Sequence, residues 1–307
     1  MSYTPKELTW AGVAKESSWG TATNPTYYIP FKDCKPNDNI ETIKDEGLRG
    51  AMSQTYNILQ GIKHSEIDLS GEIFPDSFGL LLLSVFGTDT VTGTPTKTHT
   101  FTLSRTSQPT SLTFSRYDGT NMRRFAGHMC EELTIKWADK SALEFSFKSK
   151  GKSSATSTLT TPSYTTTVPF QNWNFALTLG GSANLNLIGF DISLKRKSTI
   201  LHPANSTADP SAVIVGGLSA TGKATFLKAD DTELTAFLNN TQQALALTGT
   251  QSATGYGMTI TLTKVAFTKA PVTAKDVVEV DIEFEGIDNT TDYGPCSIAL
   301  INGVTSY

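Results

Sequence analysis

Apolar and polar residues alternate through much of the chain, and this pattern predicts β-strands. Residues 128–151 and 257–286 show it most clearly, because apolar side chains recur there at every second position. A period of two is the pattern of a strand with one buried and one exposed face. The chain is therefore predicted to be mainly β, with each of these two segments forming a long hairpin.

Two strand segments that contain a glycine near their ends are each followed by a short amphipathic segment. The strands are predicted at 58–74 and 213–226, and the helices after them at Asp76 and Asp231. Acidic residues are well suited to a helix N-terminus. The same order of elements thus occurs twice, which indicates a tandem duplication of one mostly-β module carrying one short helix.

A hairpin with a long tip precedes each of these strand–helix units. The first spans about 40–62 with its tip at 45–50, and the second spans about 187–217 with its tip at 195–211. A polar, charge-poor segment broken by two prolines separates the two halves and is typical of a linker. The predicted organisation is an N-terminal arm (1–35), module 1 (36–151), a linker (152–169), and module 2 with a C-terminal strand (170–307).

Composition narrows the function classes. A formal charge of -4 over 307 residues argues against a sequence-independent nucleic-acid binder, which needs a basic surface. Cys34, Cys130 and Cys296 are widely spaced and odd in number, so a disulfide framework is not expected. The longest apolar run, at 80–83, is too short to span a bilayer, and no signal peptide is predicted.

The stretch from Gly217 to Lys223 has the spacing of a phosphate-binding P-loop but lacks its chemistry. Ala224 stands where a P-loop needs a hydroxyl for Mg²⁺, and the segment continues as strand beyond the lysine. The matching position in the first half is Glu72, which would repel a phosphate. A glycine bend within a strand is the preferred interpretation, and an NTPase is the least favoured function.

No other motif predicts catalysis. His64, His99, His128 and His202 share no ligand spacing, and no nucleophile elbow or zinc-protease motif is present. The sequence therefore predicts a protein that is not an enzyme, with no cofactor and no metal site.

Carboxylates line two of the predicted strands on one face. An ordinary solvated face is one interpretation, and a surface that repels DNA phosphates is the other. The candidates for such a surface are Glu279, Asp281, Glu283, Glu285, Glu66, Asp68 and Glu72.

The N-terminal stretch 10–31 resembles the opening of the tail tube (major tail) proteins of long-tailed bacteriophages. The resemblance rests on the block Gly12–Ala22 (GVAKESSWGTA), and is extended by 46–50 (EGLRG) and by 61–87. None of these motifs is catalytic. The alternative is a β-sandwich protein of a virion or adhesin that binds a receptor or carbohydrate.

The resemblance implies two tandem tail-tube-type β-sandwich modules whose strands join a ring-closed β-barrel. Three copies would form a ring that mimics six-fold symmetry, and stacked rings would form the conduit for genome ejection in a siphovirus-type, long non-contractile tail. The implied partners are further copies of the chain, the tape measure protein, the tail tip and terminator proteins, and double-stranded DNA that passes without specific binding. The implied location is the virion tail, after synthesis in the host cytoplasm. The acidic residues above would face the lumen, and candidates for ring-to-ring contact are Asp45, Glu46, Leu48, Arg49, Lys195, Arg196 and Lys197.

Overall fold

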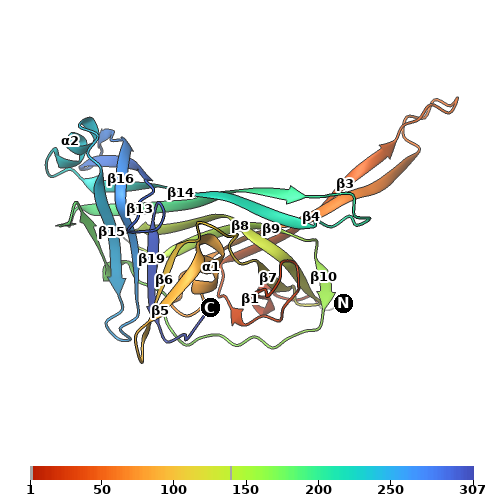
Figure 1. Cartoon of the computed structure of the whole chain (residues 1–307), viewed down its shortest axis with the longest axis horizontal. Coiled ribbons are helices and arrows are strands. Elements are labelled where there is room, and N and C mark those ends of the chain that lie inside the picture. The colour runs from red at the N-terminus through yellow and green to blue at the C-terminus, as the bar shows by residue number, and fades with distance from the viewer. Residues whose placement is uncertain (1–2, 139) are drawn as a thin grey trace.

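The computed structural model describes residues 3–138 and 140–307 of the chain and confirms the mainly β prediction (Figure 1). Its helices are α1 (Gly79–Phe86) and α2 (Thr232–Leu238), with 3₁₀ turns η1 (Lys6–Leu8) and η2 (Asn172–Asn174). The strands are β1 (Trp10–Lys15), β2 (Tyr27–Tyr28), β3 (Asp33–Asp45), β4 (Asn57–Glu72), β5 (Gly87–Thr92), β6 (Lys97–Leu103), β7 (Leu112–Tyr117), β8 (Met122–Ala138), β9 (Glu144–Gly151), β10 (Ala155–Ser157), β11 (Phe175–Leu179), β12 (Ser182–Asn184), β13 (Leu187–Leu201), β14 (Ala212–Leu227), β15 (Gln243–Thr250), β16 (Gly257–Lys269), β17 (Val272–Ala274), β18 (Val278–Gly286) and β19 (Ser297–Asn302).

Eight antiparallel strands form a long central sheet in the order β3-β4-β9-β8-β13-β14-β18-β16. One row of directly paired residues crosses all eight strands and shows that they share one face. From edge to edge the row reads Asp33, Ser70, Ser146, Thr134, Ser193, Thr221, Glu285 and Ala266.

The sheet consists of two groups of four strands that pair in the same order. The first group is β3-β4-β9-β8, and the second is β13-β14-β18-β16. Both long hairpins also contain a register irregularity, between Ile40 and Thr42 in the first and between Arg196 and Ser198 in the second. The junction of the groups is the pairing of β8 with β13.

Within the described residues of one chain, this sheet does not close into a barrel. Among the described residues, β3 pairs only with β4, so its other edge is open. At the opposite end, β16 pairs with β18 from Val265 to Lys269 and has no strand on its other side beyond Val265. The two ends of the central sheet are therefore unpaired strand edges, which readily accept another strand.

The apolar face of the central sheet packs against the remaining strands and α1. Every residue of α1 is buried, whereas α2 has only Glu233 buried and leaves Leu238 exposed. Helix α1 begins three residues later than predicted, since residues 75–78 form a turn. The Asp76 carbonyl in this turn accepts a hydrogen bond from the Tyr307 hydroxyl at 3.2 Å.

The N-terminal segment, expected as an arm, contains the buried strand β1, which pairs with β7 along its whole length. Glu16 follows β1 and is itself only 4% exposed. Its carboxylate accepts four hydrogen bonds, from the Ser111 and Thr113 hydroxyls at 2.6 Å each and from the Gly20 and Gly127 backbone amides at 2.7 Å each. This carboxylate fastens the N-terminal segment to the first strand group.

The C-terminal segment also joins distant parts of the chain. Strand β19 pairs with β16 on one side and with β6 on the other. Beyond it, the Val304 carbonyl lies 2.9 Å from Nε2 of the buried His99, and the Tyr307 ring packs against that histidine. The last strand thus joins β16 of the second strand group to β6 of the first half of the chain.

Candidate assembly surface

The polar face of the central sheet carries the seven carboxylates identified from the sequence. Those of the first half lie on β4, between the buried Ile67, Leu69 and Ile73, and those of the second half lie on β18, between buried apolar residues. A second cross-strand row connects the two sets and consists of Glu72, Glu144, Lys136, Asp191, Lys223, Glu283 and Lys269. All seven carboxylates therefore lie on one continuous face.

Lysines from neighbouring strands and turns neutralise much of this carboxylate charge. Five of the seven carboxylates have a lysine nitrogen within 4 Å: Glu66 (Lys150, 3.6 Å), Glu72 (Lys32, 3.1 Å), Asp281 (Lys223, 3.5 Å), Glu283 (Lys269, 2.8 Å) and Glu279 (Lys275, 2.5 Å). The alternation along a single strand could not reveal most of these partners, because all but Lys275, which lies four residues from Glu279, are distant in sequence from their carboxylates. The face is a network of cross-strand ion pairs and not a purely acidic wall.

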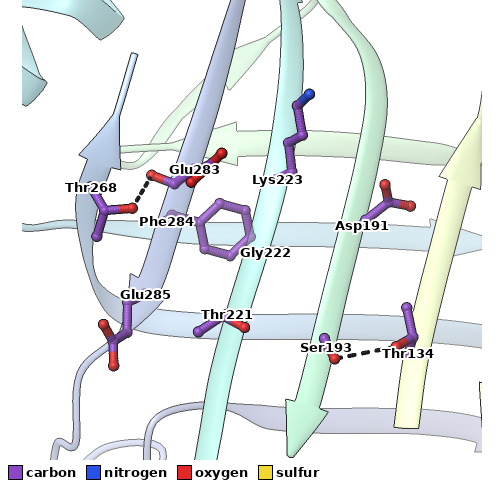
Figure 2. Close-up of a pocket in the computed structure, with 10 residues that line it drawn as sticks. All are labelled: Thr134, Asp191, Ser193, Thr221, Gly222, Lys223, Thr268, Glu283, Phe284 and Glu285. Carbon is purple, nitrogen blue, oxygen red and sulfur yellow. Dashed lines mark hydrogen bonds between the residues drawn. The ribbon is translucent and has the colours of Figure 1, made fainter. Parts of the chain in front are cut away.

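A shallow hollow of about 370 Å³ lies on this sheet, around the segment that resembled a P-loop. Figure 2 shows the residues that line it. Gly222 and Lys223 lie within β14, so the prediction of a continuing strand is confirmed. Lys223 is paired with Asp281, whose pKa is lowered first by a hydrogen bond from Thr225 and further by Lys223. This arrangement leaves the lysine engaged by a carboxylate in place of a phosphate.

Gly222 has a packing role. A Cβ atom at this position would lie 2.3 Å from Cζ of Phe284 and 2.4 Å from the Asp191 carbonyl oxygen. The Phe284 ring stacks on Phe190 at a centroid distance of 5.8 Å. The glycine therefore allows an aromatic side chain to lie against the backbone of β14.

The first long hairpin projects from the body of the molecule, as Figure 1 shows at the end opposite α2. Asp45 ends β3, while Glu46, Leu48 and Arg49 lie in the loop beyond it, where Arg49 pairs with Asp45 and lies over the Tyr56 ring. Seven large apolar side chains are exposed on this hairpin: Ile40, Ile43, Leu48, Met52, Ile58, Leu59 and Ile62. Such a concentration of apolar surface on a projecting element is typical of an interaction site.

The tip of the second hairpin instead lies against the first strand group of its own chain. The Lys63 backbone amide donates to the Ala208 carbonyl at 2.9 Å, and the Lys63 ammonium lies 3.3 Å from Asp209. Ser153 also donates a hydrogen bond to Asp209 at 2.5 Å. The tip of the second hairpin thus docks on β4 at the base of the first hairpin, whereas the tip of the first hairpin projects away from the body of the molecule (Figure 1).

The three basic residues expected in the second tip lie within β13, because the loop itself comprises only 202–211. Lys195 is on the polar face, 3.1 Å from Glu132, and Lys197 is exposed. Arg196 lies on the opposite face and is only 5% exposed. Its burial is not evident from the sequence, where it stands between two lysines.

Among the described residues, no group of three or more potential ligands is placed to hold a metal ion. His128 is buried and lies within hydrogen-bonding distance of the Ser65 and Ser149 hydroxyls, and burial lowers its pKa to about 3. Burial likewise raises the pKa of the Cys34 thiol to about 11. No helix in the described part of the chain is long and apolar enough to cross a membrane.

A family model for phage tail tube proteins matches residues 11–286, a range that includes all eight strands of the central sheet. The chain belongs to the phage tail tube protein family. No curated protein matches the chain. The family assigns this tail tube protein a structural role in the virion tail and is generally non-enzymatic.

Family membership confirms the resemblance predicted from 10–31, 46–50 and 61–87. The structure adds a reason for part of the N-terminal block: Glu16 lies within it and accepts the four hydrogen bonds described above. The sequence also identified the exposed first hairpin. The cross-strand lysines and the docking of the second hairpin depend on strand order, which sequence periodicity does not encode.

Proposed function

We propose that this tail tube protein closes into a ring by pairing the open edge of β3 with the open edge of β16 in the next copy. The β8–β13 junction carries the proposal, because it is an edge-to-edge contact of the same kind within one chain. In the pairing order, β3 holds the place of β13 and β16 holds the place of β8. Ring closure would satisfy both unpaired edges.

The eight-residue row supplies the expected register. Ser193 pairs with Thr134 at the internal junction, and their hydroxyls lie 3.2 Å apart (Figure 2). Asp33 and Ala266 occupy the two ends of the same row. In the ring, Asp33 of one copy would therefore lie opposite Ala266 of the next.

The repeated strand order supports two modules, 36–151 and 170–307, connected by 152–169. With two modules in each copy, three copies would supply the six strand groups of a ring that mimics six-fold symmetry. Head-to-tail contacts of this kind generate closed rings when the rotation closes. The tape measure, tail tip and terminator proteins are the further partners that such a tube would need.

The polar face of the central sheet is the proposed wall of the lumen, with its seven carboxylates facing the DNA. Ion pairing on this face also limits adhesion, because lysines held by carboxylates are less available to phosphates. The wall would then let double-stranded DNA pass during genome ejection. Burial supports this choice of face, since the other face of the sheet is covered by the apolar core.

Rings would stack through the projecting first hairpin, whose loop contains Glu46, Leu48 and Arg49. Its exposed apolar residues have no partner surface among the described residues, and stacking would bury them. Lys195 and Lys197 remain candidates for contacts between rings, whereas Arg196 is buried within its own chain.

Electron microscopy and disulfide crosslinking test the proposal together. Stacked rings with an open lumen are expected at high protein concentration, and the variant Asp33→Cys/Ala266→Cys should form crosslinked oligomers on oxidation. Cys34 should contribute little background, since its raised pKa of about 11 disfavours the thiolate.

The matched control is Asp33→Cys/Thr134→Cys. Thr134 lies on the same polar face, but its strand edge is already occupied by β13. Crosslinking of the control as efficient as that of the Ala266 pair would contradict the proposed edge contact. Persistent monomers at high concentration would contradict the ring itself.

A further inference from the structure

Arg196 is a buried cation with unsatisfied hydrogen-bond donors. It is 5% exposed, and its Nε and Nη1 atoms have no hydrogen-bond partner among the described residues. Removing a guanidinium from water without giving it acceptors is costly, and a buried charge is normally paired. These two donors are therefore available to a partner from outside the described residues.

The side chain lines a hollow of about 660 Å³ between the β13–β14 hairpin and the loop that follows β6. The loop after β6, with Ser104, Arg105 and Gln108, forms one wall, and the register irregularity at Gly216 and Gly217 forms the other. Gln108 holds the walls together, because its amide exchanges two hydrogen bonds with the Val215 backbone at 2.9 and 3.0 Å. The hollow is thus a built feature of the contact between the loop after β6 and β14.

The charge balance of the hollow is positive. Arg105 is compensated by Asp288 at 2.8 Å, and it also donates to the backbone carbonyls of Tyr293 and Asn289. No carboxylate of the described residues pairs with Arg196, whose Nε and Nη1 atoms have no hydrogen-bond partner there. One positive charge consequently remains on a buried side chain beside this open hollow, where it acts more strongly than a fully solvated charge.

We propose that this hollow binds a small oxyanion, a phosphate or a carboxylate, through the Arg196 guanidinium. An arginine is suited to this task because it stays charged and presents donors in a planar arrangement that matches these anions. Gly217 leaves room for the anion, since a Cβ atom there would have no other atom within 4 Å. The site differs from the P-loop motif, because no helix N-terminus is involved and Lys223 is paired elsewhere.

Isothermal titration calorimetry of the full chain tests the site with inorganic phosphate, acetate and chloride at constant ionic strength. Saturable binding of phosphate or acetate, with chloride much weaker, is expected for the natural protein. A preference for phosphate would identify a free phosphate as the ligand, and equal binding of acetate would identify a carboxylate-type ligand. Arg196→Met should weaken the binding at least about tenfold, the factor expected when a charge-assisted hydrogen bond is lost.

Arg123→Met is the matched control, because Arg123 lies on β8 away from the hollow and donates to Ser154. It should bind the anion as the natural protein does. Gly217→Asp gives a second variant that does not depend on the folding of Arg196→Met. The new carboxylate would repel the anion at an open position, so binding should again fall at least about tenfold.

Absence of saturable binding by the natural protein would overturn the proposal. The same holds if chloride binds as well as phosphate and acetate, or if both Arg196→Met and Gly217→Asp retain the natural affinity while their circular dichroism spectra remain unchanged.

Discussion

Glu16 provides a sharp test of how the N-terminal segment is held. Each of its two carboxylate oxygens accepts one hydroxyl and one backbone amide: Oε1 from Thr113 and Gly127, and Oε2 from Ser111 and Gly20. In Glu16→Gln, one oxygen becomes an NH₂ group, which can only donate. A hydroxyl can rotate to accept a hydrogen bond from this NH₂ group, but a backbone N–H can only donate. Each carboxylate oxygen faces one backbone N–H, so one of the two N–H groups would face the NH₂ group.

The isosteric change is therefore expected to be strongly destabilising in either orientation of the amide. One buried N–H loses its acceptor and the charge that strengthened the other hydrogen bonds disappears, which together should cost about 2–4 kcal/mol in the free energy of unfolding. For a chain of this size, the melting temperature should fall by roughly 3–6 °C.

Urea and thermal unfolding followed by circular dichroism measure this loss. The control is Glu7→Gln, the same substitution at an exposed position of η1, which should change stability by less than about 0.5 kcal/mol. A Glu16→Gln variant as stable as the control would refute the argument that the backbone donors require a carboxylate.

Two further predictions concern His128 and Gly222. Burial lowers the pKa of His128 to about 3 from the ordinary 6.5, so between these pH values the unfolded state binds a proton that the folded state does not. The free energy of unfolding should therefore fall as pH drops below about 6.5, by up to about 1.4 kcal/mol per pH unit until about pH 3. Urea unfolding between pH 6.5 and 5 should show this slope in the natural protein and a smaller one in His128→Gln, and equal slopes would contradict the prediction. Gly222→Ala should lower stability by roughly 1–3 kcal/mol, because the new Cβ would meet Phe284 and the Asp191 carbonyl. Gly217→Ala, in the same strand with open space around it, is the control, and equal thermal stability of the two variants would argue against the packing role.

The sequence was sufficient to predict local structure because side-chain alternation is a local property of strands. The long hairpins, the mainly β class and the strand conformation around Lys223 follow from residues close together in the chain. The helix start at Asp76 was three residues early, since the turn before α1 is formed with the distant Tyr307. The first 35 residues illustrate the same limit, as they gave no alternation strong enough to predict the pairing of β1 with β7.

The candidate surface was predictable only in part. Carboxylates on β4 and β18 could be assigned to one face of each strand from the sequence, but their lysine partners could not, since ion pairs such as Lys223–Asp281 join strands far apart in the chain. The burial of Arg196 was equally hidden, because it depends on a hollow formed by two distant loops.

Side-chain patterns along the chain specify which residues can form strands and which side of each strand is polar. Tertiary structure alone decided that β8 pairs with β13, that one hairpin docks on its own chain while the other projects, and that two strand edges stay open. The physical reason is that backbone hydrogen bonding is nearly independent of side-chain identity, so any strand edge can pair with many others. Strand order is therefore fixed by the packing of the whole chain and not by the pattern within any one strand.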